Sequence, residues 1–126
     1  MIHLDTNLLV ELVTAGSSGG KVMRQWLLAG EQLGTSAIAW SEFCNGPLSS
    51  AQKDAAFAVL AGSIAEFTWR EAEEAARLFN LAGRRKGSHA DCMIAAAAMA
   101  AGARLATRNL ADFNRFTVHG LQLEAS

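Results

Sequence analysis

The chain has 126 residues, of which 51% are apolar and 18% are charged, and its formal net charge is −1. This length accommodates one hydrophobic core, so we expect a single domain over residues 1–126. The composition excludes a disordered chain and a polyelectrolyte, and the near-zero net charge restricts any nucleic-acid contact to a local cluster of Lys and Arg.

Short apolar runs alternate with helical patterns in the first half of the chain. Residues 2–5 form an apolar run that ends in the capping residues Asp5, Thr6 and Asn7, and a helical pattern follows over residues 8–13. The later predicted elements of this half are a helix over 22–30, a strand over 33–40 leading into a helix at 41–43, a helix over 50–60 and a strand over 64–67.

The second half continues the alternation. The predicted elements are an amphipathic helix over 72–82, a basic loop over 83–87, an alanine-rich helix from Ser88 as its cap to 101, a strand over 104–107, a helical turn over 109–113 and a strand over 118–123. Strands that alternate with helices predict right-handed crossovers and a parallel arrangement. We therefore expect an α/β fold, a three-layer α/β/α sandwich with a mostly parallel central sheet.

Neither a membrane segment nor a disulfide framework is expected. The longest apolar run, residues 93–101, is shorter than a bilayer span, and the N-terminal residues lack the features of a signal peptide. We expect a cytoplasmic protein that does not contact the membrane. Cys44 and Cys92 are not paired with histidines at zinc-ligand spacing, so we expect both to be buried thiols.

Four acidic residues are predicted to meet at the carboxyl edge of the sheet, where ligands bind in folds of this kind. Asp5 ends the first strand, Glu42 follows the second, and Asp112 follows the strand over 104–107. Asp91 lies in the first turn of the preceding helix, and that helix begins at the same edge because it runs opposite to the strand. Neighbouring negative charges raise the pKa of each carboxyl group, and a bound divalent cation relieves the repulsion between the carboxylates. Oxygen ligands without His or Cys favour Mg²⁺ or Mn²⁺ over Zn²⁺.

Helix capping is the alternative role for these acids. Residues 88–91 match a capping box, and residues 109–112 place an acid at the third helical position after a capping Asn. Glu42 is the acid that capping explains least well, so the capping hypothesis accounts for individual acids better than for all four together.

Four segments in the same order resemble the successive motifs of a known family. They are residues 2–7 (IHLDTN), 36–46 (SAIAWSEFCNG), 91–96 (DCMIAA) and 107–113 (TRNLADF). Together they resemble PIN-domain ribonucleases, most closely the VapC-type toxins of bacterial toxin–antitoxin pairs. The resemblance covers essentially the whole chain, although residues 87–89 stand where the family often has a proline.

This resemblance implies a PIN-like domain with an acidic, Mg²⁺-dependent centre that cleaves RNA. The implied site comprises the catalytic acids Asp5, Glu42, Asp91 and Asp112, with Thr6 and Asn109 as polar supporters. We expect Asp5 and Asp91 to be the main metal ligands, with the other two acids holding metal-bound water or a second ion.

Basic residues near this edge are candidates for RNA binding. Arg84, Arg85 and Lys86 lie between glycines shortly before Asp91, where they could hold RNA phosphates, and Arg108 has a similar position. The alternative is a solvated helix end whose cations interact with the helix dipole.

The resemblance also implies a homodimer and a small antitoxin. Apolar residues of the early helices could form such interfaces: Val22, Met23, Trp26, Leu27, Phe57, Val59 and Leu60. We expect an antitoxin helix to lie along these helices and an antitoxin Arg to enter the acidic site. The alternative is a monomer in which these residues all belong to the core.

Two other functions remain open. One is a metal-dependent phosphatase or phosphoacceptor domain, in which a strand-terminal Asp is phosphorylated. It is disfavoured because Asn7, rather than a second acid, stands two residues after Asp5, and because no lysine directly follows a late strand. The other is a catalytically silent binding domain of the same fold, which the presence of all four acids disfavours.

Overall fold

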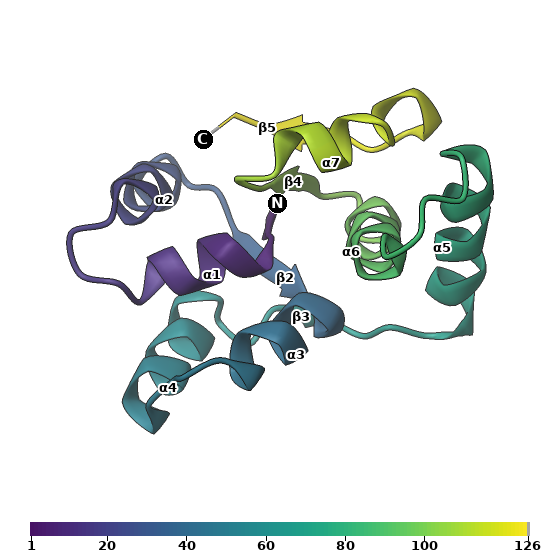
Figure 1. Cartoon of the computed structure of the whole chain (residues 1–126). Coiled ribbons are helices and arrows are strands. Elements are labelled where there is room, and N and C mark those ends of the chain that lie inside the picture. The colour runs from purple at the N-terminus through teal and green to yellow at the C-terminus, as the bar shows by residue number, and fades with distance from the viewer. Residues whose placement is uncertain (126) are drawn as a thin grey trace.

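The computed structural model describes residues 1–125, in which seven α-helices surround a five-stranded sheet (Figure 1). The strands are β1 (Ile2–Leu4), β2 (Leu33–Ser36), β3 (Ile64–Ala65), β4 (Arg104–Ala106) and β5 (Leu123–Glu124). The helices are α1 (Thr6–Leu12), α2 (Ser18–Leu28), α3 (Ala37–Asn45), α4 (Ser50–Val59), α5 (Trp69–Leu81), α6 (His89–Ala100) and α7 (Leu110–Asn114). Within this part of the chain, no helix is both long and apolar enough to cross a bilayer.

All strand pairs of the sheet are parallel, and the order is β3-β2-β1-β4-β5. Strand β1 is central: His3 is in register with Gly34 of β2 on one side and with Leu105 of β4 on the other. The chain therefore builds the sheet outward in opposite directions from β1, and such a reversal opens a crevice at the carboxyl ends of the strands. This crevice is where Asp5 follows β1.

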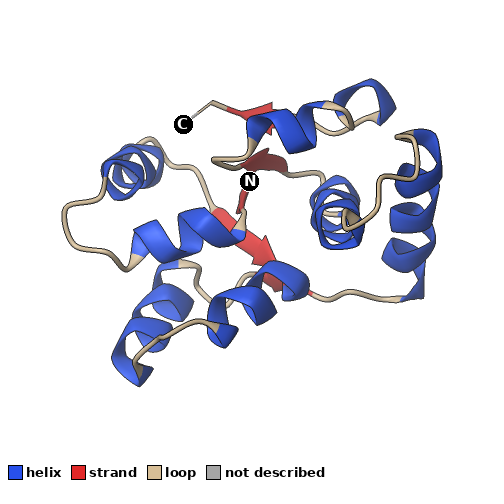
Figure 2. Ribbon diagram, in the orientation of Figure 1, coloured by secondary structure: helices blue, strands red, loops and turns tan. Residues whose placement is uncertain are grey.

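Helices cover both faces of the sheet. Figure 1 shows α1 and α2 on one side of the strands and α5 and α6 on the other, and Figure 2 shows the strands enclosed by helices. Four consecutive alanines of α6, residues 95–98, are buried, and their small side chains allow the helix to lie close to the sheet. The predicted three-layer α/β/α sandwich is confirmed, and α6 holds Asp91 against the core.

The strand predicted over 33–40 begins at the correct residue but is shorter than predicted at its C-terminal end. Strand β2 stops at Ser36, and α3 begins at once, because the Ser36 hydroxyl accepts a hydrogen bond from the Ala39 N–H at 3.0 Å and caps the helix. Glu42 therefore lies in the C-terminal half of α3, several residues beyond the end of the strand.

The last predicted strand, over 118–123, was also misplaced. Residues Thr117–His119 form a 3₁₀ turn in which Val118 is 82% exposed, and β5 covers only Leu123–Glu124. Gly120 ends this turn at a φ of +114°, a left-handed conformation that glycine adopts without strain. The alternating pattern predicted a strand where the backbone instead turns.

Two smaller expectations were only partly correct. Cys92 is buried, as predicted, whereas Cys44 is exposed near the end of α3. Ser88 precedes α6, but its hydroxyl donates to the Arg85 carbonyl at 2.7 Å and does not cap the helix. The capping box predicted for residues 88–91 therefore does not form.

A buried histidine in the central strand makes the stability of the fold dependent on pH. His3 is 2% exposed, its Nδ1 has no hydrogen-bond partner, and burial, with a smaller contribution from the N-terminal charge, lowers its pKa from 6.5 to about 4. The unfolded chain therefore binds this proton at a higher pH than the folded chain, so stability is lost as the pH falls from 6.5 towards 4.

We expect this effect to cost about 2 kcal/mol of unfolding free energy between pH 7.5 and pH 5. Urea unfolding of the wild type and of His3→Leu at both pH values measures it, because the variant keeps the carboxylates but lacks the imidazole. The free-energy difference between the two proteins should shift by that amount in favour of the variant at pH 5. A difference that does not change with pH would show that His3 is not buried in its neutral form.

Candidate active site

Asp5 is fixed at the junction of β1 and α1. Its side chain is buried and accepts two hydrogen bonds, one from the Thr6 N–H at 2.8 Å and one from the Thr107 hydroxyl at 2.6 Å. Burial raises the pKa of Asp5, the two hydrogen bonds lower it, and the negative charge of Glu42 adds a smaller upward contribution. Asp5 thus contributes to the start of α1 and also presents a carboxylate at the crevice.

Glu42 joins this carboxylate through a shared neighbour. The Thr6 hydroxyl donates to Glu42 Oε1 at 2.8 Å, while the backbone of the same threonine contacts Asp5. Thr6, predicted as a polar supporter, therefore links α1 to α3. Although α3 begins earlier than predicted, Glu42 still reaches the edge at which the sequence placed it.

Asp91 lies among the other three acids. Burial raises its pKa, and the negative charges of Asp5, Asp112 and, to a smaller extent, Glu42 raise it further, while the positive charge of Arg115 lowers it. Direct contacts join the acids in two pairs: Thr6 contacts both Asp5 and Glu42, and Arg115 contacts both Asp91 and the Asp112 carbonyl. The four acids come from elements far apart in the sequence: the start of α1, α3, α6 and the first turn of α7.

Asp112 contacts a basic residue of the loop before α6. It lies in the first turn of α7, and Arg85 Nη1 is 3.0 Å from its Oδ1. Asn109, which precedes this helix, makes no side-chain cap. Its side chain is exposed, and its backbone makes the contacts: the N–H donates to the Thr107 hydroxyl at 2.9 Å, and the carbonyl accepts from the Asp112 and Phe113 N–H groups. The supporting role predicted for the Asn109 side chain stays a prediction.

The donor set of this cluster fits a hard divalent cation. All the candidate donors are oxygen atoms, and the mutual repulsion acting on Asp91 is of the kind that a bound cation relieves. Within residues 1–125, no three His, Cys, Asp or Glu side chains form a ready-made metal site. Mg²⁺ is commonly held by one or two carboxylates, with water and substrate phosphates as its other ligands, so two acids such as Asp5 and Asp91 would suffice.

The sequence interpretation missed two residues that contact the acids. Thr107 is buried at the end of β4 and donates to Asp5. Arg115 has Nη2 3.9 Å from Asp91 Oδ2, and its Nε donates to the Asp112 carbonyl at 2.7 Å. Thr107 could have been found, because it begins the resembling segment 107–113 at the carboxyl edge. Arg115 carries no sequence signal of its own, since it follows a short helical turn.

The basic residues predicted to bind RNA have different neighbours. Arg85 reaches the acidic edge through Asp112, and Lys86 is exposed in the same loop. Arg84 turns away from the acids towards α5, where its guanidinium lies over the Phe79 ring. The loop thus lies beside the site, but its arginines point in two directions.

Arg108 is engaged in an ion pair. Its Nε and Nη2 lie 2.7 and 2.9 Å from the Glu11 carboxylate, and Nη2 also donates to the Ser18 hydroxyl at 3.1 Å. The hydrogen bond from Arg108 lowers the pKa of Glu11. These hydrogen bonds link the segment after β4 to α1 and α2. RNA phosphates would have to compete with Glu11 for the Arg108 guanidinium.

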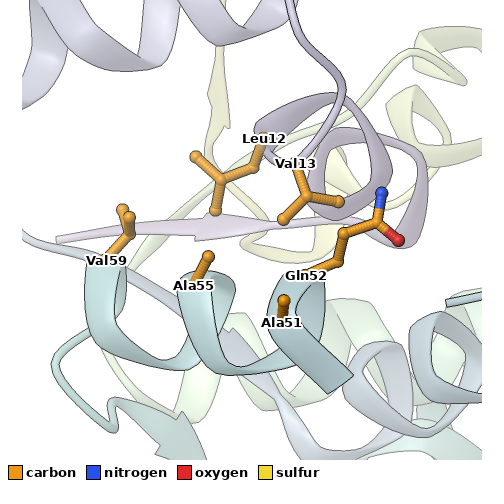
Figure 3. Close-up of a pocket in the computed structure, with 6 residues that line it drawn as sticks. All are labelled: Leu12, Val13, Ala51, Gln52, Ala55 and Val59. Carbon is orange, nitrogen blue, oxygen red and sulfur yellow. The ribbon is translucent and has the colours of Figure 1, made fainter. Parts of the chain in front are cut away.

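An apolar cavity of about 220 Å³ lies between the end of α1 and α4 (Figure 3). It is lined by Leu12, Val13, Ala51, Gln52, Ala55 and Val59. Of the apolar residues that the sequence suggested for interfaces, Met23 and Leu60 belong to the core, whereas Leu27, Phe57 and Val59 are exposed. Of these exposed residues, Val59 lines the cavity. We call the cavity and its lining the α1–α4 surface.

Several solved structures are similar to this fold. FitAcB from Neisseria gonorrhoeae is 24% identical with a TM-score of 0.76, and the match covers 99% of this chain and 97% of that one. A toxin–antitoxin complex from Klebsiella pneumoniae is 25% identical with a TM-score of 0.70, and the match covers 90% of each chain. VapC20 from Mycobacterium tuberculosis, described as a sarcin-ricin loop cleaving toxin, is 17% identical with a TM-score of 0.65 over 96% of each chain.

No curated protein matches the chain significantly by sequence. A sequence model of the PIN domain matches residues 2–118, which include all four acids. The order of the motifs, the parallel sheet and this match agree, and the chain therefore belongs to the PIN domain family.

Proposed function

We propose that the protein is an Mg²⁺-dependent endoribonuclease and the toxin of a toxin–antitoxin pair. The observation that carries this proposal is the placement of the acids at the carboxyl edge of a parallel sheet, where Thr6 links Asp5 to Glu42 and Arg115 links Asp91 to the Asp112 backbone. The similarity in fold to VapC20 and to toxin–antitoxin complexes supports it.

The proposed chemistry assigns a task to each side chain. When bound, Mg²⁺ would polarise a phosphate oxygen and lower the pKa of the attacking water, and Mn²⁺ could substitute for it. Asp5 and Asp91 would be its protein ligands, and the Thr107 hydroxyl holds the Asp5 carboxylate in one orientation. Glu42 and Asp112 would orient water, and Arg85 and Lys86 would hold flanking phosphates.

Incubation of RNA with the purified protein tests this proposal. We expect cleavage in Mg²⁺ or Mn²⁺ and none in excess EDTA, and a loss of more than about 100-fold in Asp5→Asn, because a ligand is removed. Asp54→Asn is the matched control, since Asp54 is exposed on α4 and is the only other aspartate of the chain. Undiminished cleavage in EDTA by protein free of contaminating nuclease would refute the metal-dependent mechanism.

The same experiment separates the other two functions. A phosphatase or phosphoacceptor would release phosphate from a monoester or carry it covalently on Asp5, and it would leave internal RNA bonds intact. A silent binding domain would bind without cleaving in any metal. Either result would replace the ribonuclease proposal.

We further propose that the antitoxin covers the α1–α4 surface. The cavity there is apolar, exposed Phe57 and Val59 lie on the same helix, and a cavity between two helices suits an apolar side chain of a partner helix. An Arg of the antitoxin would enter the acidic site and compete with the metal. The proposed homodimer would use apolar surface that this contact leaves free.

Two substitutions on one helix test the antitoxin contact. Ala55→Glu introduces a charge into the cavity and should abolish co-purification with the co-expressed antitoxin. Ala58→Glu, on the same helix but outside the cavity lining, should leave the complex intact. Equal effects of the two substitutions would contradict this assignment. Light scattering over a concentration series tests the dimer, which a monomer at every concentration would refute.

A further inference from the structure

A second cavity, of about 310 Å³, lies between α5 and α6. Figure 1 shows these two helices on the side of the strands opposite α1. Its apolar lining includes Phe67, Phe79 and Met93, and its polar lining is Asn80, Arg84 and His89. We call it the α5–α6 cavity. Unlike the α1–α4 surface cavity, which has no cationic lining residue, it combines aromatic rings with a guanidinium, an imidazole and an amide, and no acid lines it.

Planar side chains gather on one ring at this cavity. His89 stacks on Phe79 with ring centroids 4.4 Å apart and an interplanar angle of 18°, and the Arg84 guanidinium lies 5.2 Å from the centre of the same ring. Arg84 also donates to the Asn80 side chain. Planar groups packed on aromatic rings, with cations beside them, are the features by which proteins hold unpaired bases.

Arg84 occupies a strained backbone position. Its φ is +57°, a left-handed conformation that a residue with a long side chain adopts only at a cost, and it follows Gly83 at +90°. The turn sends the Arg84 side chain back over α5, where it lines the cavity. A glycine at this position would relieve the strain, so the presence of arginine indicates a role for its side chain.

Two short stretches of chain connect the residues that line the cavity to the residues of the acidic site. Arg84 lines the cavity while the next residue, Arg85, lies 3.0 Å from Asp112. His89 and Asp91 both lie in the first turn of α6. An RNA strand with a phosphate at the acids would therefore cross the loop over 83–87 and bring a neighbouring nucleotide to the α5–α6 cavity.

We propose that the α5–α6 cavity is a nucleobase subsite, which takes one unpaired base near the cleaved phosphodiester bond. This inference rests on the proposed function and specifies its substrate: RNA in which a base beside the cleavage point is free to leave its stack. Arg84 and His89 supply hydrogen-bonding groups for the edge of the base, and Phe67 and Met93 supply the apolar contacts. The Asn80 amide donates to the Ala76 carbonyl and accepts from Arg84, so it holds the guanidinium in place.

Free nucleotides test this subsite without any cleavage. The probes are the four nucleoside 5′-monophosphates, with ribose 5-phosphate as the compound that lacks a base, all in EDTA. The reporters are the methyl signals of the protein's four methionines, of which Met93 lines the cavity. At least one nucleotide should shift the Met93 signal in a saturable manner, and ribose 5-phosphate should not.

Three variants locate the effect. Arg84→Gly and His89→Ala should each weaken nucleotide binding by about 5-fold or more, the range expected for loss of contacts to one base. Arg84→Gly should melt no lower than the wild type, because glycine adopts this φ freely, so weaker binding would not reflect unfolding. Arg70→Ala is the control: Arg70 also stacks on an aromatic ring of α5, at 4.6 Å from the centre of Trp69, but lies outside the cavity lining.

Several outcomes would overturn the subsite. The Met93 signal could stay unshifted with every nucleotide, or ribose 5-phosphate could shift it equally. Arg70→Ala could weaken nucleotide binding as much as the two cavity variants do. A change of oligomeric state in those two variants would instead assign the cavity to a second copy of the chain. Because no metal or cleavage is involved, RNA cleavage without nucleotide binding would reject only the subsite. Nucleotide binding in a protein that cleaves no RNA would reject only the ribonuclease.

Discussion

Asp91→Asn should lower RNA cleavage by more than about 100-fold and leave the melting temperature of the metal-free protein unchanged or higher. Burial and the charges of neighbouring acids raise the pKa of Asp91 above its ordinary value of 3.8. The metal-free protein therefore loses stability as Asp91 ionises with rising pH, and the neutral amide removes that cost. Cleavage rates and thermal unfolding of the two proteins at neutral pH check both parts.

The opposite result would support the capping hypothesis. If Asp91 only stabilised the start of α6, its substitution would lower the melting temperature by several degrees, whether or not metal is present. Asp54→Asn, the same change on an exposed face of α4, should alter neither cleavage nor unfolding. A less stable Asp91→Asn that still cleaves RNA would contradict our account of this residue.

Thr107→Val should have the second largest effect, a loss of about 10- to 100-fold in cleavage. Valine has nearly the shape of threonine but lacks the hydroxyl that donates to Asp5 at 2.6 Å and accepts from the Asn109 N–H. Asp5 would lose a hydrogen bond that holds its pKa down, and the cost in stability should be about 1–3 kcal/mol. Thr107→Ser keeps the hydroxyl and should retain most of the activity.

A second buried threonine provides the matched control. The Thr35 hydroxyl donates to the Leu4 carbonyl at 2.7 Å and touches no acid. Thr35→Val should therefore cost comparable stability, measured by urea unfolding, and leave the cleavage rate of the folded protein near that of the wild type. Equal losses of cleavage in both variants would show that Thr107 acts only through stability.

The carboxyl-edge rule was enough to bring the four acids together from the sequence. Asp5 and Asp91 lie where the strand and helix patterns predicted, because the β1–α1 junction and the buried face of α6 both have strong local signals. Glu42 lies at the predicted edge but within α3, because the Ser36 cap starts this helix before the predicted end of the strand. The edge of the sheet at which the acids lie was therefore more predictable than the residues at which helices and strands begin and end.

Contacts between distant segments could not be predicted in this way. The neighbours of Arg115 depend on how α7 packs beside α6, and Arg108 is tied to Glu11, which is far away in the sequence. The opposite directions of Arg84 and Arg85 depend on the left-handed turn at residues 83–84. The basic loop was recognised from its composition, but the different neighbours of Arg84 and Arg85 are visible only in three dimensions.

We propose that the carboxylates of the acidic site hold the divalent cation needed for RNA cleavage. Titration calorimetry of Mn²⁺ into the wild type and into Asp91→Asn tests it most directly, with Asp54→Asn as the control. We expect saturable Mn²⁺ binding to the wild type and to the control, and Mn²⁺ binding at least about 10-fold weaker in Asp91→Asn. Equal affinity in all three proteins, or RNA cleavage by a wild type that binds no Mn²⁺ or Mg²⁺, would contradict it.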